Sequence, residues 1–135
     1  MIYLLDSNVW VALLRGKSAQ VEARFRAVTA TADVRVCSVV VAELRYGAAR
    51  SARPATNRAA VDAVLAPFLS FPFDDAATDH FVATRTHLES LGAPIGPYDL
   101  QIAAIALANA CTLVTHNTAE FSRVPGLVLE DWEVP

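Results

Sequence analysis

The sequence contains the stretch Met1-Ile2-Tyr3-Leu4-Leu5-Asp6-Ser7-Asn8-Val9-Trp10, and this stretch decides the fold class. Residues 2–5 are a short apolar run that predicts a buried strand, and the apolar residues after Ser7 recur at helical spacing up to Gly16. A strand that leads directly into a helix is the first half of a β–α–β unit, whose strands are parallel. The stretch therefore predicts a parallel sheet with Asp6 at the carboxyl edge of a strand, where such sheets bind ligands.

The remaining sequence alternates strand and helix patterns in the same way. Strands are expected at residues 34–37, 71–73, 112–115 and 127–129, and helices at about 19–28, 38–50, 57–69, 74–91 and from 99 onward. We expect Ser7 and Asn57 to cap their helices. Pro72 restricts the strand at 71–73 to an edge of the sheet. The predicted fold class is α/β, an α/β/α sandwich with a mostly parallel sheet, in a single domain over residues 1–135.

Composition predicts a compact globular protein, because 54% of the 135 residues are hydrophobic and 19% are charged. No apolar stretch reaches the ~20 residues that span a bilayer, and the N-terminal one lacks a basic leader. We therefore expect a soluble, cytoplasmic protein. Cys37 and Cys111 are the only cysteines, and their wide separation favours two buried thiols over a disulfide or a metal site.

The net charge of −3 is unevenly distributed. Residues 1–58 hold nine basic and four acidic groups, a balance of +5, and residues 59–135 hold two basic and ten acidic groups, a balance of −8. The charged residues between Glu43 and Asp62 are Arg45, Arg50, Arg53 and Arg58. Beside an acidic centre these arginines would suit a polyanionic substrate. From charge alone, a solvated arginine face or a subunit interface explains them equally well.

Three acidic residues, Asp6, Glu43 and Asp99, are each set among apolar neighbours. An unpaired carboxylate is almost never buried, because its removal from water is strongly unfavourable. Asp6 alone could cap the following helix, and Asp99 alone could suit the dipole at a helix start. Glu43 has no such explanation, because in the middle of a helix on an apolar face it needs a metal, an arginine or a proton. Together the three acids predict a shared cation.

The oxygen ligands in this pattern favour Mg²⁺ or Mn²⁺ over zinc. Thr115 and Asn117 follow the strand at 112–115 and are expected at the same edge of the sheet as Asp6. An ion in such a site binds a phosphodiester, activates a water molecule and stabilises the departing oxygen. The pattern therefore predicts metal-dependent phosphodiester hydrolysis.

Four blocks of the sequence resemble the PIN-domain ribonucleases, and in particular the VapC-type toxins of bacterial VapBC toxin–antitoxin systems, including the FitB-like branch. The blocks occur in the family order and are residues 5–8, 38–47, 94–104 and 115–121. The resemblance implies a single PIN domain, usually a homodimer, that uses Mg²⁺ or Mn²⁺ to cut single-stranded regions of RNA, with tRNA or rRNA as candidate substrates. It also implies a cognate VapB-type antitoxin that crosses the groove and places an arginine among the acids.

Carried over residue by residue, the resemblance makes Asp6, Glu43 and Asp99 the metal ligands and Asn117 the fourth catalytic position, which is Asp or Asn in the family. Because Asn117 has no charge, any second metal ion would bind weakly, or would bind only when substrate is present. The expected supporting residues are Ser7, Asn8, Thr115 and Glu120, and the candidate RNA-binding residues are Arg45, Arg50 and Arg53.

Some of these roles stay open from the sequence. Glu120 either compensates partly for the missing charge of Asn117 or is a surface residue. Arg45 either binds phosphate or neutralises the acidic cluster. His116 is adjacent to the site and could contact RNA, although a solvent-facing position is the stronger expectation.

Two other functions compete with the nuclease hypothesis. In a phosphatase with Asp6 as nucleophile, a second Asp is generally required two residues on, and this position holds Asn8. A PIN-like module that binds RNA or a partner without cutting is compatible with Asn117, although the three retained acids favour activity. Cleavage of RNA that is restored by Mg²⁺ or Mn²⁺ would support the nuclease alone.

Overall fold

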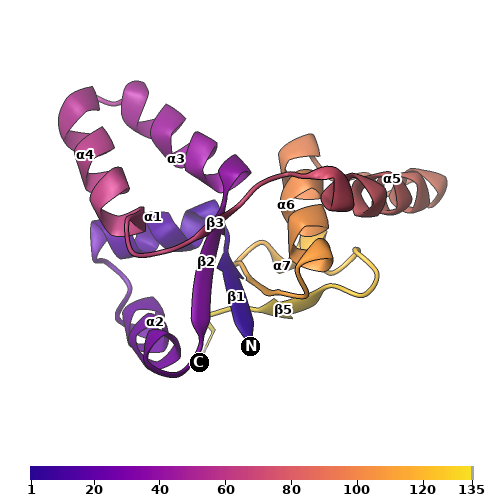
Figure 1. The fold of residues 1–135 in the computed structure, drawn as a ribbon, viewed down its shortest axis with the longest axis horizontal. Coiled ribbons are helices and arrows are strands. Elements are labelled where there is room, and N and C mark those ends of the chain that lie inside the picture. Colours follow the sequence, from indigo (N-terminus) through magenta and orange to yellow (C-terminus); the bar gives the residue numbers. More distant parts are fainter. Residues whose placement is uncertain (135) are drawn as a thin grey trace.

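The computed structural model describes residues 1–134 and has an α/β fold built on one five-stranded sheet (Figure 1). The strands are β1 (Ile2–Leu5), β2 (Asp33–Cys37), β3 (Ser70–Phe71), β4 (Thr112–Val114) and β5 (Val128–Glu130). Their order across the sheet is β3-β2-β1-β4-β5, and every neighbouring pair is parallel. The expected α/β class is confirmed, and the sheet is entirely parallel. Pro135, the last residue of the expected domain, lies outside the described residues.

Seven helices connect the strands within residues 1–134. They are α1 (Ser7–Arg15), α2 (Ala19–Thr31), α3 (Ser38–Ala49), α4 (Pro54–Leu65), α5 (Asp75–Ser90), α6 (Pro97–Ala108) and α7 (Thr118–Phe121). In Figure 1 the first four helices lie to the left of β1 and β2, and the last three lie to the right. The sheet is therefore covered on both faces, as a parallel sheet requires. None of the described helices is long and apolar enough to cross a membrane.

Strand β1 is the centre of the sheet. Leu4 and Leu5 are fully buried, and Leu4 lies opposite Arg35 of β2 and Leu113 of β4. The ladder continues one residue beyond the strand, because the N–H of Asp6 donates to the carbonyl of Val114 at 2.9 Å. The sheet itself thereby fixes the backbone of Asp6.

The first helix is capped by Asp6, so the predicted Ser7 cap is wrong. Asp6 has an extended backbone, and its Oδ1 accepts a hydrogen bond from the N–H of Ser7 at 2.8 Å. Gly16, with φ of 62°, ends the helix in the left-handed conformation that glycine adopts most easily. Because Asp6 takes the cap, the hydroxyl of Ser7 is available for another partner.

Several other boundaries differ from the prediction, and among them β4 ends at Val114 and not at Thr115, and α6 begins at Pro97 and not at Asp99. Helix α4 begins at Pro54 and not at Asn57, because proline lacks an N–H and is well suited to the first helical position, and it ends at Leu65. Strand β3 ends at Phe71, before Pro72, and lies at the edge of the sheet as expected. Helix α2 extends to Thr31.

Trp10 fixes helix α1 against the rest of the core. Its side chain is fully buried, and its Nε1 donates to the carbonyl of Leu5 at 3.1 Å. Its ring packs against Phe25 of α2 and against Phe68, with centroids 5.9 Å and 5.3 Å away. The two cysteines are also buried and free, as expected.

We predict that Trp10→Ala lowers the free energy of unfolding by about 3–5 kcal/mol, because it leaves a cavity and removes a buried hydrogen bond. Urea denaturation measures this loss. Val128→Ala removes a side chain that is exposed on β5, and it should change stability by less than about 0.5 kcal/mol. A loss below about 1 kcal/mol for Trp10→Ala would contradict this description of the core.

Candidate active site

Polar side chains from separate segments meet at the carboxyl edge of the sheet. Asp6 follows β1 directly, and Thr115 and Asn117 follow β4. Asp99 lies in the first turn of α6, and Glu43 lies in the middle of α3. The sequence places these residues far apart, and the parallel sheet brings them together.

Asp6 is the most buried carboxylate of the group, with 7% of its surface exposed. Its Oδ1 accepts the hydrogen bond from the backbone of Ser7, and its Oδ2 accepts one from the hydroxyl of Thr115 at 2.9 Å. The Thr115 hydroxyl in turn accepts a hydrogen bond from the backbone N–H of Asn117 at 3.0 Å. Burial raises the pKa of Asp6, and the two hydrogen bonds it accepts oppose that increase.

Glu43 is joined to the same group through Ser7. The Ser7 hydroxyl donates to Oε1 of Glu43 at 2.8 Å, across 36 positions in the sequence. Burial raises the pKa of Glu43, and the negative charge of Asp6 raises it further, while the hydrogen bond from Ser7 lowers it. Ser7 therefore bridges two carboxylates, with its backbone bound to Asp6 and its hydroxyl bound to Glu43.

Asp99 is the third acid of the group, and it interacts with Asp6 and Glu43 through their negative charges. Burial raises its pKa to about 7, with further contributions from a hydrogen bond to the Glu120 carboxylate and from the charges of Asp6 and Glu43. The pKa of Glu120 is lowered by its hydrogen bond with Asp99 and by the Asn117 amide, which donates to it at 2.9 Å. The contact between the two carboxyl groups therefore raises the pKa of Asp99 and lowers that of Glu120.

No basic side chain within residues 1–134 forms an ion pair with Asp6, Glu43 or Asp99. Arg45 pairs instead with Asp62 at 3.2 Å, so it does not neutralise the acidic cluster. The guanidinium of Arg50 lies 5.7 Å from the ring centroid of Tyr46. Arg53 occupies the cap position of α4. The candidate RNA-binding arginines therefore lie along α3 and the start of α4, outside the acidic cluster.

The donor set fits a hard divalent cation. It consists of carboxylate, amide and hydroxyl oxygens, which are the ligands that Mg²⁺ and Mn²⁺ prefer. The pKa values of Asp6, Glu43 and Asp99 are all raised, so added positive charge would stabilise their ionised forms. The oxygens of these three acids do not all lie within 4.8 Å of one another among the described residues, so a common ion would require their side chains to move closer together.

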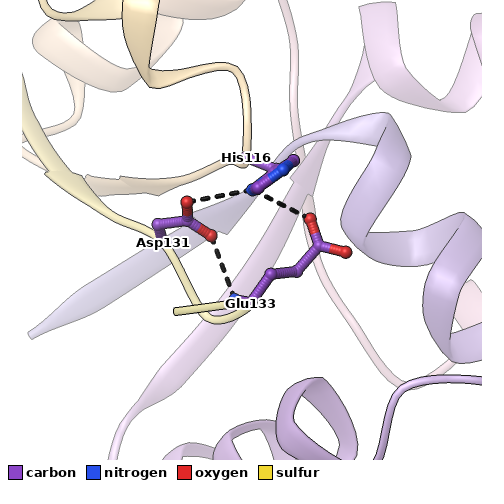
Figure 2. Close-up of side chains that lie close together, drawn as sticks. All are labelled: His116, Asp131 and Glu133. Carbon is purple, nitrogen blue, oxygen red and sulfur yellow. Dashed lines mark hydrogen bonds and ion pairs between the residues drawn. The ribbon is translucent and has the colours of Figure 1, made fainter. Parts of the chain in front are cut away.

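A second cluster joins His116 to the C-terminal segment (Figure 2). Nδ1 of His116 lies 3.0 Å from Oδ2 of Asp131 and 3.1 Å from Oε2 of Glu133. The hydrogen bond with Asp131 and the two negative charges raise the pKa of His116, whose side chain is 59% exposed. This cluster ties the loop between Thr115 and Asn117 to the end of the chain.

Among the predicted supporting residues, Asn8 is the one that the structure does not bring into the network. Its side chain is exposed, and within residues 1–134 it has no hydrogen bond to another site residue. Sequence reasoning in turn missed Asp131 and Glu133 as partners of His116. The signal for them was the acidic stretch at residues 130–133, which gave no indication of where it would fold.

Comparisons with known proteins identify the family. Residues 3–127 match the PIN domain family. Ribonuclease VapC2 of Rickettsia felis is 35% identical over 133 residues, which are 98% of this chain and 99% of that protein. The tRNA(fMet)-specific endonuclease VapC of Shigella flexneri is 35% identical over 130 residues, which are 96% of this chain and 97% of that protein.

Solved structures give the same result. In the structure of VapBC2 from Rickettsia felis bound to a DNA fragment from its promoter, the matching chain has a TM-score of 0.92 and 34% identity, with 98% of this chain and 99% of that chain covered. In FitAcB from Neisseria gonorrhoeae the TM-score is 0.83 at 25% identity, with both chains fully covered. The chain therefore belongs to the PIN domain family and is a homologue of the VapC ribonucleases.

Proposed function

We propose that this protein is a metal-dependent endoribonuclease, the toxin of a toxin–antitoxin pair, and that it hydrolyses phosphodiester bonds in single-stranded regions of RNA. The observation that carries the proposal is the cluster of Asp6, Glu43 and Asp99, which has no basic partner within the described residues. Relatives that align over almost the whole chain are ribonucleases, including one specific for tRNA(fMet). The proposed substrate is tRNA or rRNA. The proposed location is the cytoplasm.

Mg²⁺ or Mn²⁺ is the proposed cofactor, held by Asp6, Glu43 and Asp99. When bound, such an ion supplies positive charge for a phosphate oxygen and lowers the pKa of a water molecule. Asp6 and Glu43 are kept in one orientation by Thr115 and Ser7, whose hydroxyls donate to them at 2.9 Å and 2.8 Å. This fixed arrangement reduces the entropy that would be lost when the ion and substrate bind.

Asn117 and Glu120 support the same site. The amide nitrogen of Asn117 donates to Glu120, which leaves its amide oxygen available for a ligand or a water molecule. Glu120 helps to raise the pKa of Asp99, so an ion bound at Asp99 would displace a proton that this carboxyl group holds at lower pH. Glu120 is thus a working part of the site and compensates in part for the missing charge at position 117.

The proposed partner is a cognate VapB-type antitoxin, in addition to a second copy of this chain in a homodimer. The solved relatives include toxin–antitoxin complexes of the VapBC and FitAB types. A C-terminal antitoxin segment that places an arginine among Asp6, Glu43 and Asp99 would supply the charge that the cluster lacks. An arginine fork matches carboxylates bidentately and would compete with the ion.

A catalytically weak RNA- or partner-binding module is the second candidate, because Asn117 carries no charge. Substitution of the three acids separates the two functions. Asp6→Asn, Glu43→Gln and Asp99→Asn should each reduce RNA cleavage in Mg²⁺ or Mn²⁺ by at least about 100-fold. Circular dichroism should show an intact fold. Glu89→Gln, an exposed acid on α5 paired with Arg85, is the matched control and should retain wild-type activity. Wild-type cleavage by Asp99→Asn would refute the assignment of the site.

Asn117→Ala should have a milder effect, a loss of about 10-fold in cleavage rate. It removes an amide oxygen and the hydrogen bond to Glu120 but no charge. Single-turnover cleavage of the same RNA measures the difference. If Asn117→Ala lost as much activity as Asp99→Asn, then the amide would be as important as a charged ligand.

The metal-free protein should lose stability as the pH rises from about 4 to 7. The folded-state pKa of Asp99 is about 7 and its ordinary value is 3.8, so between these values Asp99 binds more protons in the folded state than in the unfolded state. The expected loss is about 1–2 kcal/mol, since one unit of pKa shift corresponds to about 1.4 kcal/mol and solvent screens a half-buried group. Denaturation in EDTA at several pH values measures it. Asp99→Asn should remove most of this dependence, and an unchanged slope in that variant would contradict the assignment.

A further inference from the structure

A cavity opens beside the acidic cluster and is not explained by metal binding. It has a volume of about 860 Å³ and lies between helix α3, the segment that follows β3, and the first turns of α6. Its walls include Glu43 and Tyr46 of α3, Phe73, and Tyr98 and Gln101 of α6. A volume of this size is within the range of about 300–1,000 Å³ that small-molecule sites occupy.

The cavity is continuous with the proposed catalytic site. Glu43 belongs to both, because it lines the cavity and is bonded to Ser7. Tyr98 directly precedes Asp99, and both lie in the first turn of α6. A molecule in the cavity would therefore lie next to a phosphate held at the acids.

The walls of the cavity are aromatic, and two of the aromatic rings are exposed. Tyr46 and Tyr98 have 66% and 62% of their surface exposed, whereas Phe73 packs edge-on against Phe81 at 5.7 Å. The Arg50 guanidinium lies near the Tyr46 ring, and no acidic group within residues 1–134 pairs with it. Exposed aromatic faces beside a free positive charge are the features by which proteins bind single-stranded nucleic acid.

We propose that this cavity binds an unstacked nucleobase of the RNA, adjacent to the phosphate that is cut, with Tyr46 and Tyr98 as stacking surfaces and Gln101 as a hydrogen-bonding group for the base edge. This inference rests on the proposed ribonuclease function and specifies how its substrate is held. Bases in a duplex are already stacked and cannot enter such a cavity, so it would select single-stranded RNA.

A nucleotide suits the cavity better than an apolar surface of another protein molecule. Glu43, whose ionised form has no basic partner among the described residues, forms part of the wall, and an apolar cover would remove that carboxylate from water without compensation. A nucleotide instead brings a flat apolar base together with a phosphate that binds the ion at the acids. Arg50 would then be available for the neighbouring phosphate.

Binding measurements on two probes of equal charge test the proposal. The probes are a ten-nucleotide oligouridylate and an oligomer of the same length without bases, both labelled for fluorescence anisotropy. The protein carries Asp99→Asn to prevent cleavage, and Mg²⁺ is present. In this background, Tyr98→Ala and Tyr46→Ala should each weaken binding of the oligouridylate about 5- to 100-fold and leave binding of the abasic oligomer unchanged. Tyr98→Phe, which keeps the ring, should bind within about twofold of the parent.

Val128→Ala, an exposed apolar residue on β5 away from the cavity, is the matched control and should bind both probes as the parent does. The proposal would be overturned if the tyrosine variants weakened the binding of both probes equally, or if they weakened the binding of neither. Conversion of a dimer to a monomer by Tyr46→Ala or Tyr98→Ala, measured by light scattering, would also overturn it and would make the cavity a subunit interface. RNA cleavage by the protein without these substitutions is measured separately, so failure of the ribonuclease function and failure of the base site give different results.

Discussion

The hydrogen bond from the Thr115 hydroxyl to the Asp6 carboxylate is the contact on which the rest of the site depends. It joins the ends of β1 and β4, which the sheet already places side by side through the bond between the Asp6 N–H and the Val114 carbonyl. The same carboxylate caps helix α1. Since Asp6 takes the cap, Ser7 is free to orient Glu43. One buried aspartate thus connects the central strands, the first helix and α3.

This arrangement places negative charge where water is partly excluded. Burial raises the pKa values of Asp6, Glu43 and Asp99, and the acids raise those of Glu43 and Asp99 further by repulsion. A purely structural cluster would be expected to contain an arginine or a lysine, because unpaired buried charge is destabilising. The arginines within residues 1–134 do not pair with these three acids, and Arg45, for example, pairs with Asp62. A cluster of carboxylates that lowers the stability of the protein in this way is typical of a site that binds a cation or a charged partner.

The sequence allowed the fold class to be predicted and the three acidic residues to be singled out as candidates, because both depend on local patterns. Asp6 follows an apolar strand, and Glu43 interrupts an apolar helical face, so each was visible without knowledge of the fold. The Ser7 cap was predicted wrongly because Asp and Ser are equally good caps, and the choice depends on Glu43, which is 36 residues away. The partners of His116 were missed for the same reason, since Asp131 and Glu133 approach it only through the folded C-terminal segment. The aromatic cavity likewise combines α3 with α6, and no local pattern predicts that pairing.

We propose that Asp6, Glu43 and Asp99 together hold a divalent cation. Crystals of the protein soaked in Mn²⁺ test it most directly, because the anomalous scattering of manganese locates the ion independently of any assay. We predict an anomalous peak within about 2.0–2.4 Å of carboxylate oxygens from at least two of these three acids. A peak at His116, Asp131 and Glu133 with none at the three acids, or no peak in crystals grown above pH 7, would contradict the account.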